Sequence, residues 1–441
     1  MMGKKVVIAG YYGFNNIGDE AVLNSMLNDM RFFDPNIDFV VLSDKPEHTE
    51  SSYKVRSVSW RELDKVIQVI ENCDLLIIGG GGLFNSYLEY DGNQMLSYNN
   101  SLFSVFIFSL PLLAALLDKP CMIYAIGASN FNSSEAIAHA RMAIELADIC
   151  TVRDPVSVSV LRNIGCCVDK VRVTADPAFR LQNVSSERVK KIFFQEDIPY
   201  GYSVLGVVLR NWDFYGDPLR TEHEISKALK RFSNSFKGII LFIPFDTNTA
   251  LGDLSNDKTI IARMKTYIDS NMVFSLEGDY TPSEISSIIA NCDLVLGMRL
   301  HSCIFSIKNY VPVIGLVYDQ KVKNIMDMAG MKDFLIDIKN INADNVYYLL
   351  QNLYNKRKEV SNYLLHTTDN LKKSALENAK LALEIVNGRK DIKSNTFSST
   401  QYIKKIALKQ TKNLIEIEKK LINSIKQYWH IIMLSGNLLM N

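Results

Sequence analysis

Several marks of common protein classes are missing from this sequence. Its 441 residues carry 49 Lys and Arg against 48 Asp and Glu, a formal charge of +1, so no net charge attracts nucleic acid or an acidic polymer. It has no Gly-Lys-Ser/Thr phosphate loop, no Cys-x-x-Cys pair and no His, Cys or carboxylate cluster with metal-ligand spacing. We therefore expect no nucleic-acid partner, no metal and no P-loop nucleotide chemistry.

Cysteines and long apolar runs are also scarce. The seven cysteines are odd in number and mostly lie in apolar stretches, which favours reduced core residues over a disulfide framework. The most apolar run, Leu102–Leu117, contains Pro111 and is shorter than the about 20 residues that cross a bilayer, so we expect a buried helix. Because the segment Met1–Gly10 leads directly into a predicted strand, we expect no signal peptide and a cytoplasmic protein.

Short apolar runs that end near Gly or Asp recur along the chain, with room for a helix between them. This alternation is typical of an α/β chain with parallel sheets. Helical patterns such as Glu20–Arg31 and Ser134–Ala147 separate the runs. The predicted strands are Val6–Ala9, Phe39–Leu42, Leu75–Ile78, Met122–Ala125, Ile149–Val152 and Val171–Val173 in the first half, and Val204–Leu209, Ile239–Ile243, Val273–Leu276, Leu294–Leu296 and Val313–Val317 in the second.

A polar stretch divides these runs into two series. We expect an N-terminal Rossmann-like domain over residues 1–181, a linker over 182–200, a C-terminal Rossmann-like domain over 201–388 and a tail over 389–441. Open parallel sheets bind ligands at the carboxyl ends of their strands. The two domains are therefore expected to face each other across a cleft that these strand-end loops line.

The first strand leads into a glycine-containing loop, Gly10–Glu20, just before a helical pattern. Such a loop offers free N–H groups at a helix N-terminus, so it is either a ligand loop that uses Asn16 or a tight structural turn. Asp19 and Glu20 would repel an anion. We expect them to cap the helix or to bind sugar hydroxyls.

The third run ends in four glycines, Gly79–Gly82. Four glycines cost more backbone entropy than a turn requires, so they indicate a close approach by another group. Gly80 and Gly81 would approach either the substrate or the neighbouring domain, and Asn85 just beyond them is a candidate binder of sugar hydroxyls.

Two further acidic motifs end strands of the first half. Arg153-Asp154 lies at a predicted domain edge, where an Arg-Asp pair is often only a structural ion pair. Asp176 either points into the cleft or holds the turn before Pro177.

The second half carries the sharper chemical signals. Arg210 and Arg299 follow predicted strands, and His301 lies two residues after Arg299, so in an extended stretch these two side chains share a face. Arginine binds carboxylate and phosphate through two hydrogen bonds, and histidine exchanges a proton near neutral pH. Tyr318 and Lys321 follow the next strand; Lys321 is either a third positive charge or a solvated surface lysine.

Taken in order, these motifs resemble the polysaccharide pyruvyl transferase family over about residues 5–330. The matching segments are Gly13-Phe14-Asn15-Asn16-Ile17-Gly18-Asp19-Glu20, Gly79–Gly82, Val152-Arg153-Asp154, Thr174-Ala175-Asp176-Pro177, Arg210-Asn211-Trp212, Arg299-Leu300-His301 and Tyr318-Asp319-Gln320-Lys321-Val322. The resemblance implies a GT-B-like fold with two Rossmann-type domains. It also implies that Arg210 and Arg299 hold the donor and that His301 is the catalytic acid. Ala128-Ser129 departs from the Gly-Pro turn of many relatives, which affects the acceptor side.

The resemblance also implies the reaction. It is the transfer of a pyruvyl group from phosphoenolpyruvate, as co-substrate with no other cofactor, to a saccharide acceptor. The acceptor would be a cell-surface polysaccharide or its lipid-linked precursor, and the product a cyclic ketal plus phosphate. The alternative is a GT-B glycosyltransferase with a nucleotide-sugar donor. A non-catalytic polysaccharide-binding protein is a third class, but it has no use for paired arginines beside a histidine.

The tail over 389–441 carries a basic amphipathic pattern. Such a helix with a Trp suits the inner face of a membrane, where a lipid-linked acceptor lies. Packing on its own domain or on a second subunit of a homo-oligomer fits the same pattern. The apolar positions are Leu414, Ile417, Leu421, Ile425 and Tyr428, and the lysines around them are Lys404, Lys405, Lys409, Lys412, Lys419, Lys420 and Lys426.

Overall fold

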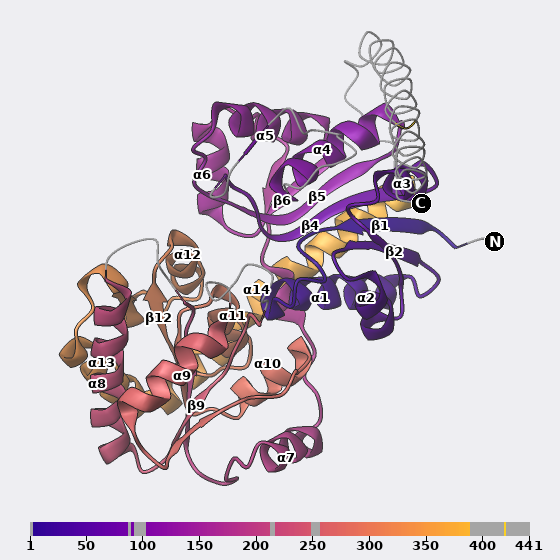
Figure 1. The fold of residues 1–441 in the computed structure, drawn as a ribbon. Coiled ribbons are helices and arrows are strands. Elements are labelled where there is room, and N and C mark those ends of the chain that lie inside the picture. Colours follow the sequence, from indigo (N-terminus) through magenta and orange to yellow (C-terminus); the bar gives the residue numbers. More distant parts are fainter. Residues whose placement is uncertain are drawn as a thin grey trace, which may run out of the picture.

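Two parallel β-sheets, one in each half of the chain, organise the protein (Figure 1). The computed structural model describes residues 3–86, 90–91, 103–211, 217–247, 256–388 and 419. The first sheet consists of β1 (Lys5–Ala9), β2 (Asp38–Ser43), β3 (Arg56–Ser59), β4 (Leu75–Phe84), β5 (Cys121–Ala128), β6 (Ile149–Val152) and β7 (Val171–Val173). The second consists of β8 (Val204–Val208), β9 (Ile239–Phe242), β10 (Val273–Ser275), β11 (Leu294–Gly297), β12 (Val313–Val317) and β13 (Leu335–Asp337).

Helices connect the strands and cover the sheets. In the first half they are α1 (Ile17–Phe33), α2 (Pro46–Tyr53), α3 (Leu63–Glu71), α4 (Phe103–Leu116), α5 (Ser134–Leu146), α6 (Pro155–Asn163) and the short η2 (Pro177–Arg180). In the second half they are α7 (Ser186–Gln195), α8 (Pro218–Phe236), α9 (Asp257–Ile268), α10 (Pro282–Ala290), α11 (Leu300–Lys308), α12 (Gln320–Met328), η4 (Lys332–Phe334), η5 (Ile338–Asn340), α13 (Ala343–Asn355) and α14 (Arg357–Val386).

The strand order places a ligand crevice in each sheet. The first sheet runs β3-β2-β1-β4-β5-β6-β7 and the second β10-β9-β8-β11-β12-β13, with every pairing parallel. In such doubly wound sheets, ligands bind beyond the carboxyl ends of the two strands where the order reverses. Those strands are β1 and β4 in the first sheet, and β8 and β11 in the second.

Alternating side chains bury both faces of the first sheet. In β1, Val6 and Ile8 pack in the core that contains α1, whereas Val7 and Ala9 pack in the core under α3, α4 and α5. A strand buried on both faces is almost entirely apolar, as expected for a parallel sheet. The core that contains α1 continues without a break into the C-terminal domain, so the two domains share buried apolar contacts.

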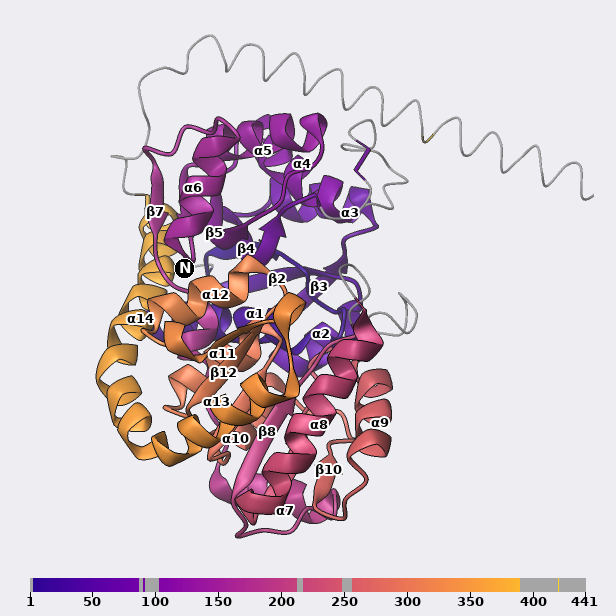
Figure 2. The same ribbon diagram turned by 90° about the vertical axis from the view of Figure 1, so that its left-hand side faces the viewer.

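The long helix α14 leaves the C-terminal domain and packs against the N-terminal one (Figures 1 and 2). There the buried Asn378 side chain bonds the hydroxyls of Thr151 and Thr174, at 2.6 and 2.9 Å, and donates to the carbonyl oxygen of Ala175. Its oxygen and nitrogen are therefore both satisfied, as a buried amide requires. This contact joins α14 to the ends of β6 and β7.

The fold prediction is confirmed in class and in most elements. All the predicted strands form, and the apolar segment before residue 117 is the largely buried α4. The sequence did not indicate β3 or β13, and it ended the third apolar run before the glycines, which in fact lie inside β4. The segment 182–200, expected as a linker, contains α7.

Three other expectations concern cysteines, membranes and the tail. The cysteines, all within the described ranges, are free, and only Cys167 is exposed. Across the described residues, no helix combines the length and the apolar character that crossing a bilayer requires. Apart from residue 419, the predicted amphipathic tail over 389–441 lies outside the described residues, so its membrane contact stays a prediction.

Candidate active site

Three cations gather around Tyr318 at the ends of β8, β11 and β12. The Arg210 guanidinium lies 5.0 Å from the centre of the tyrosine ring and donates to its hydroxyl at 3.3 Å. The Lys321 ammonium lies 5.2 Å from the same ring. Burial raises the pKa of Tyr318, but Lys321, Arg210 and Arg299 more than offset it, so the pKa lies below its usual value. The potential at this point is therefore positive.

Arg299 is held by two carboxylates. Its guanidinium lies 2.5 Å from Asp257 Oδ1 and 3.4 Å from Asp246 Oδ2. Burial opposes the charge, but these partners raise the arginine pKa above its usual value, so the residue stays cationic. Its Nε is buried and has no hydrogen-bond partner among the described residues, which leaves one N–H for a ligand.

His301 lies against a buried ion pair of the other domain. Its Nε2 is 3.6 Å from Asp176 Oδ2, and the same oxygen accepts from Arg153 Nη1 at 2.9 Å. Burial alone would raise the pKa of Asp176, but His301, Arg153 and the N–H of Ala178 hold it below its usual value. Asp176 is therefore an anion that faces the imidazole. Within the described part of the chain, His301 Nε2 has no hydrogen-bond partner.

The loop after β1 closes this site from the N-terminal domain. A Cβ on Gly18 would lie only 2.0 Å from His301 Nδ1, so glycine lets the loop touch the imidazole. Beside it, Asn16 caps α1 through Gly18 N and Asp19 N, and its amide lies 3.4 Å from Asp246 Oδ2. An isolated antiparallel bridge pairs Asn16 with Asp246. The loop after β1 is therefore in direct contact with the loop after β9 of the other domain.

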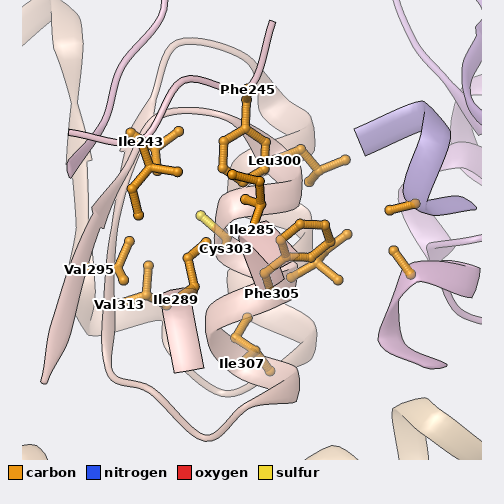
Figure 3. Close-up of a cluster of buried hydrophobic side chains, with 14 of the residues drawn as sticks. Ile243, Phe245, Ile285, Ile289, Val295, Leu300, Cys303, Phe305, Ile307 and Val313 are labelled. Carbon is orange, nitrogen blue, oxygen red and sulfur yellow. The ribbon is translucent and has the colours of Figure 1, made fainter. Parts of the chain in front are cut away.

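Apolar packing fixes the helix that presents Arg299 and His301. Leu300, Cys303 and Phe305 of α11 pack among Ile285 and Ile289 of α10 and the strands of the second sheet (Figure 3). Arg299 is the N-cap of α11 but makes no capping hydrogen bond with its side chain. The positive end of the helix dipole at the site is thus left for an anion.

The two acidic residues of the loop have different surroundings. Glu20 is buried, accepts from Gly13 N at 2.7 Å and from the Tyr53 hydroxyl at 2.6 Å, and so braces the loop. Asp19 is half-buried and does not cap the helix, a role that Asn16 fills. Burial raises the pKa of Asp19 to about 6, although His301 and Arg153 lower it.

The glycine run does make the close approach that the sequence predicts, but helix α1 is what approaches. Gly80 and Gly81 have φ of 61° and 83°. A Cβ on Gly80 would lie 1.9 Å from Val22, and one on Gly81 would lie 2.5 Å from Asp19 Oδ1. Neither the substrate nor the other domain is needed to explain them. The Asn85 amide donates to the Gly82 carbonyl oxygen, within its own turn.

The structure brings together most of the predicted site residues and corrects two points. Leu300 already belongs to helix α11, so the expectation that Arg299 and His301 lie on one face of an extended stretch is wrong. Arg153 pairs with Asp176, whereas Asp154 caps α6. The Asp176 carboxylate accepts from Ala178 N, which holds the turn, and it also lies 3.6 Å from His301 Nε2. Lys321 lies beside Tyr318 and 3.7 Å from Asp319 Oδ2.

The sequence did not single out two residues of the site. They are Asp246 and Asp257, and both contact Arg299, which is distant in the chain. A search of the described residues for groups of metal-ligating side chains finds none.

The strand order, the two parallel sheets and the helix that crosses between the domains define a GT-B-like fold. UDP-GlcNAc 2-epimerase from Neisseria meningitidis, bound to UDP-GlcNAc, matches with a TM-score of 0.59 and 11% identity, over 86% of this chain and 99% of that chain. HepE of Anabaena, in complex with UDP-glucose, matches with a TM-score of 0.56 and 13% identity, over 87% of this chain and 99% of that chain. At such identities the likeness shows the fold alone.

The family follows from the sequence match. The profile of the family described as polysaccharide pyruvyl transferase matches residues 16–320, and the chain belongs to this family. It is thus a transferase that modifies a polysaccharide. Amylovoran biosynthesis protein AmsJ of Erwinia amylovora is 20% identical over 392 residues, which cover 81% of this chain and 93% of AmsJ.

Proposed function

We propose that the protein transfers the pyruvyl group of phosphoenolpyruvate to one sugar of a cell-surface polysaccharide or of its lipid-linked precursor. The products are a cyclic ketal and phosphate. The observation that carries this proposal is the group of cations around Tyr318. The Arg210 guanidinium and the Lys321 ammonium lie 5.0 and 5.2 Å from its ring, and together with Arg299 they lower its pKa. A phenol that burial should make harder to ionise is instead easier to ionise, and the same potential stabilises a phosphate or carboxylate.

The donor's two anionic groups match the cations at the ends of β8, β11 and β12. Arg210 and Lys321 lie over the Tyr318 ring, with charge available for the phosphate. Arg299 offers its Nε–H to the carboxylate while Asp246 and Asp257 hold the rest of its guanidinium. Fixed donors of this kind act strongly on charge that moves during a reaction because they need no reorganisation.

The reaction needs one proton on carbon. In this proposal His301 protonates the methylene carbon of the donor, and the positive charge that develops on the neighbouring carbon is attacked by one sugar hydroxyl. A second hydroxyl of the same sugar then displaces phosphate and closes the ring. The Asp176 anion lies 3.6 Å from His301 Nε2, where it is the counter-ion for the charged imidazolium that a general acid needs.

Phosphate release tests the proposal. The wild-type protein is incubated with phosphoenolpyruvate and a panel of methyl hexosides that carry free 4,6- or 3,4-diols. We expect phosphate release that depends on the sugar, together with a ketal detected by mass spectrometry. Parallel reactions contain UDP-hexoses in place of phosphoenolpyruvate. Release of UDP with the same sugars, and none of phosphate, would instead identify a glycosyltransferase.

A further inference from the structure

Several carboxylates lie around His301 and Arg299, and one of them is unlike the rest. Asp176, Asp246 and Asp257 are each engaged by an arginine. The Asp19 carboxylate forms no hydrogen bond and no close ion pair with any described residue, although it shares the first turn of α1 with Gly18, which touches the imidazole. A half-buried carboxylate without a hydrogen bond is costly. The charges of His301 and Arg153 favour the Asp19 anion, but no hydrogen bond or close ion pair holds it in place.

Asp19 and the predicted donor groups belong to different domains. Asp19 belongs to the N-terminal domain, where its Oδ1 approaches Gly81 of β4, while Tyr318 and its cations belong to the C-terminal domain. A Cβ at position 81 would lie 2.5 Å from this oxygen. The β4 glycine therefore leaves room for the carboxylate beside His301.

The electrostatic surroundings suit proton exchange. Burial raises the pKa of Asp19 to about 6, with Glu20 and Asp246 adding to the rise and His301 and Arg153 opposing it. A general base works best when its pKa lies near the working pH. Asp19 fits that requirement, whereas the low pKa of Asp176 makes it a poor proton acceptor.

We propose that Asp19 is the general base that removes the proton from the first attacking sugar hydroxyl. This inference rests on the proposed function. The hydroxyl oxygen bonds to the central carbon of the donor, its proton moves to Asp19, and the His301 proton moves to the methylene carbon. The second hydroxyl then bonds to the same carbon as the carbon–oxygen bond to phosphate breaks. Its proton restores His301, and the Asp19 proton leaves on the phosphate, so both groups return to their starting states.

Two substitutions of Asp19, compared with a control substitution, test its role as the general base. Asp19→Asn and Asp19→Ala are compared with wild type and with Asp38→Asn, which makes the same chemical change at an exposed ion pair at the start of β2. Each protein is assayed for ketal formation and for the rise in melting temperature with phosphoenolpyruvate. We expect both Asp19 variants to keep the donor-induced rise and to lose turnover by about 10²–10⁴-fold. Sodium formate should restore part of the turnover of Asp19→Ala only.

The outcomes separate this inference from the function on which it rests. Turnover of Asp19→Asn within about threefold of an active wild type, or loss of the donor-induced rise in that variant, overturns the base role and leaves the reaction standing. Failure of the wild type to consume phosphoenolpyruvate with any sugar overturns the proposed function, and the base role with it.

Discussion

Replacing Asp19 by Asn should make the protein more stable at neutral pH. The pKa of Asp19 in the folded protein is about 6, above the value of about 3.9 for an unfolded chain. The folded state therefore binds the proton more tightly, and stability falls as pH rises from about 4 to about 6, where the full cost of the buried anion is reached. Asn resembles the protonated side chain and carries no such cost.

The size of this gain follows from the shift. Two pKa units correspond to about 3 kcal/mol, and partial exposure of the side chain reduces this to about 1–3 kcal/mol. For a chain of this length the melting temperature should rise by about 1–3 °C. The raised pKa of Asp19 already contains the opposing attraction to His301 and Arg153. The expected gain in stability therefore includes the loss of that attraction in Asp19→Asn.

Thermal unfolding of wild type and Asp19→Asn from about pH 5 to about pH 8 measures the effect. The difference should be small at the acidic end and largest at the basic end. Asp38→Asn, at an exposed ion pair, should differ from wild type by less than about 0.5 kcal/mol at each pH. A variant that is less stable than wild type near pH 8, or a difference that does not grow with pH, refutes the reasoning.

Three further predictions follow from the site. Gly18→Ala places a Cβ 2.0 Å from His301 Nδ1; it should displace the imidazole and reduce kcat by about 10²-fold while the protein stays folded by circular dichroism. Arg153→Met leaves the buried Asp176 without its 2.9 Å partner and should lower the free energy of unfolding in urea by about 3–5 kcal/mol; an unchanged urea midpoint contradicts this. Arg210→Met should weaken phosphoenolpyruvate binding by about 10–100-fold in calorimetry, the value of a charge-assisted hydrogen bond, whereas Arg231→Met, at an exposed ion pair with Asp344, should bind as wild type does.

The sequence predicted the architecture well because that information is local. Buried parallel strands are nearly continuous apolar runs, so β1, β4 and β8 could be located directly, and with them the strand-end positions of Arg210, Arg299 and Tyr318. The edge strand β3, with the sequence Arg-Ser-Val-Ser, has too few apolar residues to give such a signal.

The side-chain contacts in the site could not be predicted from the sequence because each contact joins segments that are distant in the chain. Arg153 has an adjacent Asp154, yet it bonds Asp176 across the ends of β6 and β7. The glycines of β4 indicated a close approach, but only the coordinates show that Val22 and Asp19 of α1 make it. Chain spacing indicates which residues end strands; contacts between loops depend on how the two sheets face each other.

The most direct test of the account is the origin of the hydrogen on the ketal methyl group. The reaction is run in heavy water with wild type and with His301→Gln, and the product is examined by mass spectrometry and NMR. We expect one deuterium in the ketal methyl group of the wild-type product and at least about 10²-fold less product from His301→Gln. A methyl group without deuterium, or undiminished product from the variant, would contradict protonation of the donor by His301.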